Sequence, residues 1–169
     1  NRGTINNQKL FAPHAVNWID ESSDHLLIFN NGYLRPVEDN MDIPYSSIEE
    51  IVTPLEENVE YLIYGDDPYG PVEYFWYYSD YQSISSIQSG AFRLENGNTL
   101  ITYTTLSKII EVSNDLDIVW EYNYPQEGTE FLSRASKYNI FYPGDINYDF
   151  TVNILDIVYV VNLILYDYQ

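Results

Sequence analysis

Cysteine is missing from this 169-residue sequence, and basic residues are scarce. Without cysteine the chain can form no disulfide, no thiolate metal site and no cysteine nucleophile. Only 7 Lys and Arg stand against 26 Asp and Glu, which gives a formal net charge of -19. Neutralising phosphates requires a basic surface, so we expect no nucleic-acid partner. An anionic membrane surface is disfavoured for the same reason.

Long hydrophobic runs are also lacking. The most apolar stretch, residues 154–165, contains Asp156 and Asn162 and is shorter than the ~20 residues that a membrane helix needs. We therefore expect no membrane span. The chain begins with Asn1 rather than methionine, so we expect a processed chain or a fragment, from which any signal peptide is already gone.

Apolar and aromatic residues, by contrast, are plentiful. Hydrophobic residues make up 45% of the chain, and 18 Tyr, 7 Phe and 3 Trp supply large side chains for a core. Short runs rich in β-branched and aromatic residues alternate with turn residues, which predicts an all-β fold. The expected strands are residues 12–19, 25–29, 48–53, 60–64, 72–78, 91–94, 99–103, 108–112 and 117–122.

The two halves of this region look like copies of one unit. Residues 15–18, a polar turn and residues 26–29 match residues 91–94, a turn and residues 100–103. A repeated four-stranded antiparallel unit is typical of a β-propeller blade, although an ordinary sandwich or meander would give similar strands. We therefore predict a partial β-propeller of about two blades. Two blades cannot close a ring of the usual four to eight, so other strands would have to complete it.

The C-terminal residues differ in kind from the rest. Asn153 can cap a helix that we expect over residues 154–166. The apolar residues of this helix surround its axis instead of forming one stripe, so it should be buried against something outside its own hairpin. The predicted organisation is a propeller-like region at 1–143 and a separate segment at 144–169.

The turn before this helix has the spacing of a calcium loop. Oxygen-bearing groups fall at loop positions 1, 3, 5, 7, 9 and 12, where position 7 contributes its main-chain carbonyl; they are Asp145, Asn147, Asp149, Thr151, Asn153 and Asp156. Phe150 occupies position 6, where the loop favours glycine, and position 12 is Asp instead of Glu. The alternative is an acidic turn with an Asx-type helix cap and no metal.

The same residues resemble a known calcium-binding module. Gly144-Asp-Ile-Asn-Tyr-Asp149, residues 152–156 and residues 160–165 are similar to one repeat of a dockerin type I module. The resemblance implies a structural calcium ion and docking to a cohesin-like partner module. Dockerins carry two such repeats, whereas this chain contains one.

A second resemblance covers roughly residues 10–144. Pro13-His-Ala-Val-Asn-Trp18, residues 26–36 and Tyr45-Ser46 resemble the arylsulfate sulfotransferase family of β-propellers. The later stretches 93–101, 110–112 and 119–122 are similar to that family's repeat unit, and residues 131–138 and 142–144 to the stretch that closes its domain.

The family resemblance implies a sulfuryl transfer from an aryl sulfate to a phenol without a nucleotide cofactor. His14 is then the expected nucleophile, and Arg35 and Asn31 are the candidates to hold the sulfuryl group or shape its loop. Ser47 stands where the family has an arginine, and the blades that carry its other active-site histidines are not in this sequence. We therefore expect this chain to be inactive by itself and to need a second polypeptide.

Two further functions remain open from the sequence. The chain could be a non-catalytic extracellular assembly subunit, because open blades expose strand edges that pair with other chains. The aromatic residues between positions 61 and 81 could bind carbohydrate, although such runs more often pack in a core. The expected partners are a polypeptide that supplies the missing blades, a cohesin-like module or identical subunits, and the expected location is secreted, extracellular or periplasmic.

Overall fold

The computed structural model describes residues 3–20, 24–37, 44–53, 65–68, 70–125, 132–138, 143–147 and 151–166. Its contacts divide the chain into two units, Asn1–Ser136 and Lys137–Gln169, and each is described by itself. In the part of the first unit that the structure describes, the regular elements are strands and two short 3-10 turns, η1 (Ile5–Asn7) and η2 (Thr104–Leu106).

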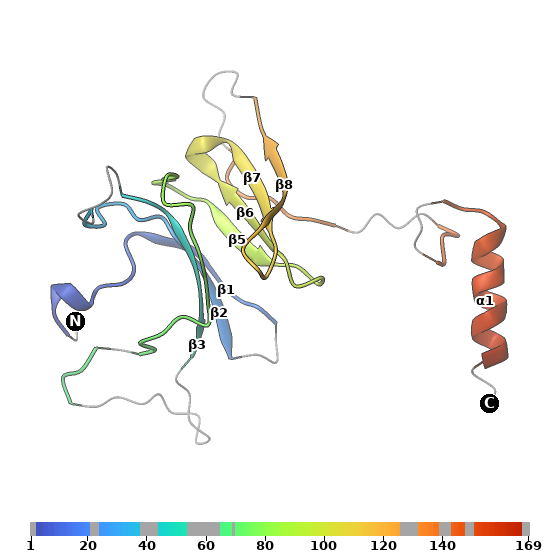
Figure 1. Ribbon diagram of the computed structural model, residues 1–169, viewed down its shortest axis with the longest axis horizontal. Coiled ribbons are helices and arrows are strands. Elements are labelled where there is room, and N and C mark those ends of the chain that lie inside the picture. The colour runs from blue at the N-terminus through green and yellow to red at the C-terminus, as the bar shows by residue number, and fades with distance from the viewer. Residues whose placement is uncertain are drawn as a thin grey trace. The chain divides into compact units, whose positions relative to one another are not determined.

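Eight strands of the first unit form two four-stranded antiparallel sheets (Figure 1). The first sheet, in the order β1-β2-β3-β4, contains β1 (Pro13–Trp18), β2 (His25–Asn30), β3 (Ser47–Val52) and β4 (Trp76–Tyr78). The second, in the order β5-β6-β7-β8, contains β5 (Gly90–Arg93), β6 (Thr99–Tyr103), β7 (Lys108–Val112) and β8 (Ile118–Asn123). Each sheet is thus a meander, and the expected repetition of one four-stranded unit is confirmed.

Most strand predictions agree with the structure to within a residue or two at each end. The exception is the strand expected over residues 72–78, of which only Trp76–Tyr78 pair with β3. Residues 70–73 form bends around Pro71, which has no N–H to donate to a ladder. The strand expected over residues 60–64 lies outside the described residues.

The hydrophobic core is formed by side chains on one face of each sheet. Its buried side chains include Leu27, Phe29 and Ile48 from the first sheet and Ile101, Tyr103 and Ile110 from the second. Phe29 and Tyr103 meet edge to face, with ring centroids 5.6 Å apart. Because the side chains of a strand alternate in direction, Ile28 and Glu49, which pair across β2 and β3, point to the opposite face.

Exposure increases toward the far edge of the second sheet. All of β6 is buried, whereas every residue of β8 is exposed, including Trp120 and Tyr122. The rings of these two residues stack with centroids 6.2 Å apart. The outermost strand therefore presents an aromatic, uncovered surface.

The second unit contains one helix, α1 (Ile154–Tyr166), as the sequence predicts. Asn153 Oδ1 accepts a hydrogen bond from the backbone N–H of Leu155 at 2.7 Å, so the predicted cap is present. Ile154, Ile157, Val161 and Leu165 are all exposed within the described residues. None of the described helices is long and apolar enough to cross a membrane.

Candidate functional site

His14 lies near the start of β1, in a segment with unusual backbone geometry. Ala12 and Ala15, on either side of it, have positive φ angles of 53° and 49°. Alanine in the left-handed region costs about 1–2 kcal/mol per residue, and such outliers gather at functional sites. The β1–β2 register also shifts between His14 and Asn17. The backbone at the start of β1 therefore departs from the regular conformation of a paired strand.

Asn31 fixes the orientation of the His14 ring. Its Oδ1 lies 2.8 Å from His14 Nδ1, and the Ala12 carbonyl lies 3.3 Å from the same nitrogen. The amide nitrogen of Asn31 donates to the carbonyls of Ser85 and Gln88 at 2.5 and 3.1 Å, so Oδ1 must be the atom that faces the histidine. Both groups near Nδ1 are acceptors, so Nδ1 carries the proton in the neutral ring and Nε2 keeps its lone pair.

Asn31 and Gly32 are buried and closely fitted. Ser46 Oγ donates to the Asn31 carbonyl at 2.7 Å, and the Ser85 N–H donates to Ser46 Oγ at 2.8 Å. Gly32 has a φ of 74°, and a methyl group on it would lie 1.9 Å from the Tyr45 carbonyl oxygen. Only glycine fits there, so the Asn31-Gly32 sequence is a packing requirement of this site.

Arg35, the third residue expected in the site, contacts a different set of groups. Its Nη2 donates to Ser47 Oγ at 2.7 Å and lies 3.6 Å from Glu49 Oε1. Its guanidinium lies over the Tyr45 ring, 4.3 Å from the centroid. The structure thus brings His14 and Asn31 together, and none of the described contacts joins Arg35 to them.

Another arginine, Arg134, lies near the His14 segment. A methyl group on Gly90 would be 3.3 Å from Ala15 Cβ and 3.6 Å from Arg134 Cγ, so the neighbour of His14 and the stem of Arg134 flank the same glycine. Ser133 Oγ donates to Gln88 Oε1 at 2.8 Å, which ties residues 132–138 to the loop that holds Asn31. The sequence could not single out this arginine, because its placement depends on a contact between distant segments.

His25, the other histidine of the chain, is partly buried in a charged cluster. Its Nδ1 lies 2.6 Å from Glu50 Oε1, and Glu50 Oε2 pairs with Arg93 Nη2. Arg93 in turn lies over the Trp76 ring, 4.7 Å from the centroid. Since Glu50 belongs to β3 and Arg93 to β5, this ion pair links the two sheets.

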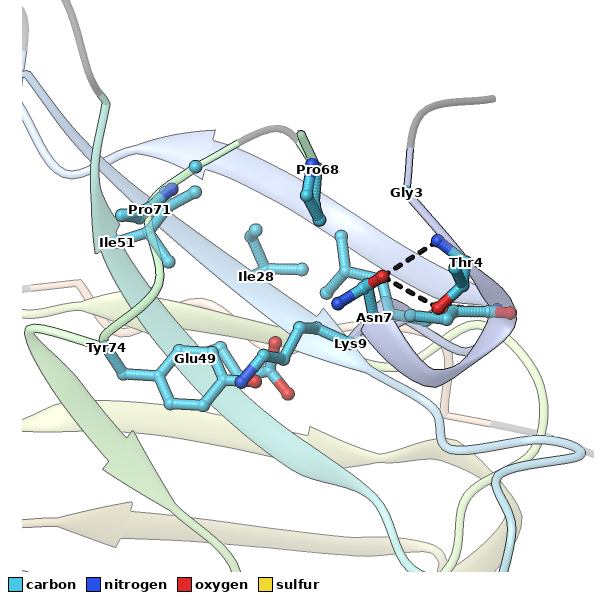
Figure 2. A pocket seen from close by; sticks show the side chains of 13 residues that line it. Gly3, Thr4, Asn7, Lys9, Ile28, Glu49, Ile51, Pro68, Pro71 and Tyr74 are labelled. Atoms are coloured by element: carbon cyan, nitrogen blue, oxygen red, sulfur yellow. Dashed lines mark hydrogen bonds between the residues drawn. The ribbon is translucent and has the colours of Figure 1, made fainter. Parts of the chain in front are cut away.

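A pocket of about 720 Å³ lies on the face of β2 and β3 that is opposite to the core side chains (Figure 2). Glu49, which is 1% exposed, forms part of its lining together with Lys9 and Tyr74. Burial raises the pKa of the Glu49 carboxyl, and this effect outweighs the hydrogen bonds from Asn30 and Ser47, which lower the pKa. Burial, followed by the charge of Glu49, also raises the pKa of Tyr74 to about 12. Glu49 cannot be recognised from the sequence, because alternation alone does not reveal a buried acid.

The predicted calcium loop is described only in part, because Asp149 lies outside the described residues. Asp145 and Asp156 are both buried. The Asp156 carboxylate accepts backbone N–H groups of Asn153, Ile146 and Asn147 at 2.8, 2.7 and 3.3 Å. These hydrogen bonds, that of Asn153 foremost, lower the pKa of Asp156. Among the described residues no three acidic or histidine side chains cluster as a metal site.

The side chain of Asn153 makes the contacts of a helix cap in this turn. Asn153 Nδ2 donates to the Thr151 carbonyl at 3.1 Å, so two of the predicted ligands are hydrogen-bonded to each other. Oxygen donors of this kind suit a hard cation. Of the two Asp156 oxygens, Oδ1 already accepts two backbone N–H groups, whereas Oδ2 accepts one and keeps a lone pair.

No protein-family model, curated protein or solved structure matches this chain.

Proposed function

We propose that this chain is part of a secreted arylsulfotransferase-like β-propeller in which His14 is the nucleophile for sulfuryl transfer. The observation that carries the proposal is the hydrogen bond between His14 Nδ1 and Asn31 Oδ1. It keeps the proton on Nδ1 and leaves the Nε2 lone pair for attack. Asn31 is itself buried and anchored by two hydrogen bonds, so it selects the tautomer that attack through Nε2 requires.

The reaction requires two displacements at sulfur. In the first, the Nε2 lone pair forms an N–S bond while the bond from sulfur to the phenolic oxygen breaks, and the phenolate leaves with that electron pair. In the second, the oxygen of another phenol attacks sulfur, the N–S bond breaks, and the acceptor's proton is released to solvent. Neutral imidazole is regenerated, and neither step needs a nucleotide or a redox partner.

A cation must stabilise the sulfuryl oxygens in both steps. Arg35 is the less suitable of the two nearby arginines, because Ser47, Glu49 and the Tyr45 ring already engage its guanidinium. Arg134 flanks Gly90 together with Ala15, next to His14 in the sequence. We assign it the role of candidate anion ligand, and further cationic groups would come from the polypeptide that completes the propeller.

The first displacement can be tested with this chain alone. The chain by itself should not turn over, but at high concentrations of 4-nitrophenyl sulfate we expect one slow displacement, with at most one equivalent of nitrophenol released and a sulfuryl adduct on the peptide that contains His14. His14→Gln should abolish the adduct, whereas His25→Gln, which removes the other histidine, should leave it. Multiple turnover should require a second polypeptide. No adduct, or an adduct that persists in His14→Gln, would refute the assignment.

A non-catalytic assembly role is the second candidate, and the exposed surfaces favour it. Every residue of β8 is exposed, and α1 exposes apolar side chains on all sides. Such surfaces are typical of protein–protein contacts. Light scattering with and without calcium separates the two roles: a calcium-dependent polymer of identical chains indicates assembly, and a discrete complex with a second polypeptide indicates the enzyme.

A further inference from the structure

The pocket lined by Glu49 is a different site from that of His14. His14 pairs with Phe29, whose side chain is in the core, whereas the pocket side chains Ile28 and Glu49 pair across β2 and β3 on the opposite face. Its walls come from η1, the segment before β1, strands β2 and β3, and residues 68–74 (Figure 2). Segments far apart in the sequence therefore meet around one cavity of about 720 Å³.

Glu49 contributes a hydrogen-bond acceptor that the protein leaves unused. Oε1 accepts hydrogen bonds from Asn30 Nδ2 and Ser47 Oγ, both at 2.8 Å. Oε2 is buried and has no hydrogen-bond partner among the described residues. Leaving a buried acceptor unpaired is unfavourable, so a donor from outside the described residues would stabilise this carboxylate.

Two side chains with donor groups, Lys9 and Asn7, line the same pocket. The Lys9 ammonium lies 5.5 Å from the centroid of the Tyr74 ring, on the wall that Glu49 shares (Figure 2). Asn7 Oδ1 accepts both the N–H and the hydroxyl of Thr4 at 2.8 Å. The Asn7 amide group is thereby oriented, and none of the hydrogen bonds described uses its nitrogen. The pocket thus combines one unused acceptor with two donors.

We propose that this pocket binds a neutral, polyhydroxylated ring compound of mono- or disaccharide size. A hydroxyl is both a donor and an acceptor, so a ligand with several hydroxyls can donate to Glu49 and accept from Lys9 and Asn7 through different groups. An anion would be repelled by Glu49, and an organic cation by Lys9. The remaining lining suits the C–H faces of a sugar ring, because Tyr74, Pro68 and Pro71 supply flat apolar surfaces.

Lys9 and Glu49 are the charged side chains of this lining, one of each sign. Tyr74 keeps its hydroxyl proton at neutral pH, because its pKa is about 12. The pocket therefore offers no excess of either charge to a ligand.

The test is saturation-transfer NMR followed by calorimetry, with the methyl glycosides of the common hexoses and pentoses, cellobiose and maltose as probes at about 10 mM. Benzylammonium and phenyl phosphate serve as charged comparisons. We expect saturable binding of at least one sugar and none of either charged probe. Glu49→Gln, which turns a donor toward the ligand, and Tyr74→Ala should each weaken binding about tenfold or more.

Two matched variants control for indirect effects. Glu95→Gln removes an exposed carboxylate in the β5–β6 turn, and Phe75→Ala removes the exposed aromatic ring next to Tyr74. Both should bind the sugar within about twofold of the wild-type chain, and circular dichroism should show that all four variants fold. The proposal is overturned if no sugar binds, if a charged probe binds instead, or if Glu49→Gln and Tyr74→Ala leave the affinity unchanged.

Discussion

At the scale of single residues, the His14 site depends on which ring nitrogen carries the proton. Free neutral histidine has no partner to decide this, whereas His14 has two acceptors near Nδ1 and one of them is an asparagine whose own orientation is fixed. The selection of a tautomer is a purely local electrostatic effect. It can be measured without substrate and without the rest of a propeller.

We predict that Asn31→Ala changes the tautomer of His14. Long-range nitrogen–proton NMR of the ring above its titration range should show Nδ1–H predominating in the wild-type chain. In the variant the mixture should shift toward Nε2–H, because only the Ala12 carbonyl at 3.3 Å remains. His25→Gln assigns the signals, and Asn98→Ala, in the β5–β6 turn, should leave them unchanged. A wild-type ring protonated mainly on Nε2 would contradict the geometry.

Glu49 should make the stability of the first unit depend on pH. Because burial raises its pKa above the ordinary 4.5, the folded state binds the proton more tightly than the unfolded state. The stabilisation is therefore complete below pH 4.5 and is lost as the pH rises through the folded-state pKa. Glu49→Gln keeps an acceptor for Asn30 and Ser47 but cannot titrate. In urea unfolding, its free energy of unfolding should therefore rise relative to that of the wild-type chain as the pH increases.

Glu95→Gln supplies the control for that experiment, since an exposed glutamate should produce no such trend. If the difference between Glu49→Gln and the wild-type chain is independent of pH, or if it reverses sign, burial does not dominate at this carboxyl.

At the scale of elements, the sequence predicts the strands well and their lateral contacts poorly. Residues 99–103 and 108–112 are apolar runs bounded by turn residues, and β6 and β7 have those bounds. Residues 72–78 have an equally strong composition, yet only three of them form β4, since β3 offers pairing partners only at residues 48–50. Strand propensity is local, whereas the length of a ladder is set by the neighbouring strand.

The ion pair between Glu50 and Arg93, which links the two sheets, could not be predicted from the sequence either. The sequence gives no reason to join Glu50 to Arg93, which are 43 positions apart. Only the packing of the two sheets brings them together, and the same holds for Arg134 near Gly90. The asparagine-glycine turn at Asn31, in contrast, could be predicted, because positive φ has a residue preference that is visible in the sequence.

We predict that Glu50→Ala destabilises the first unit by about 3–5 kcal/mol, because it leaves a buried cation unpaired. The Arg93 side chain is 12% exposed and the Glu50 side chain 5%. Adding Arg93→Met should recover part of the loss, since methionine can still pack on Trp76. Glu121→Ala breaks an exposed ion pair with Lys108 and should cost little. Equal effects of the two glutamate variants in urea titrations would contradict this role.

At the scale of the whole molecule, the charge of -19 opposes folding through self-repulsion. Raising the concentration of sodium chloride should therefore raise the melting temperature gradually, as the Debye length falls from about 30 Å at 0.01 M to about 10 Å at 0.1 M. This effect is general and does not depend on any site. This general effect of salt on the melting temperature must be separated from a specific effect of calcium on the second unit.

Calcium at matched ionic strength makes that separation. If residues 145–156 bind the ion, calcium should slow hydrogen exchange in α1 more than sodium or magnesium does, because the loop ends where the helix begins. Asp156→Asn should abolish the difference, whereas Asp115→Asn, in the β7–β8 turn, should retain it. Acidification should reduce the protection of these α1 amides from hydrogen exchange. Because the pKa of Asp156 is lowered in the folded state, its contribution to stability disappears as the pH falls through that pKa. Equal protection by calcium and sodium would leave Asp156 as a helix cap without a metal role.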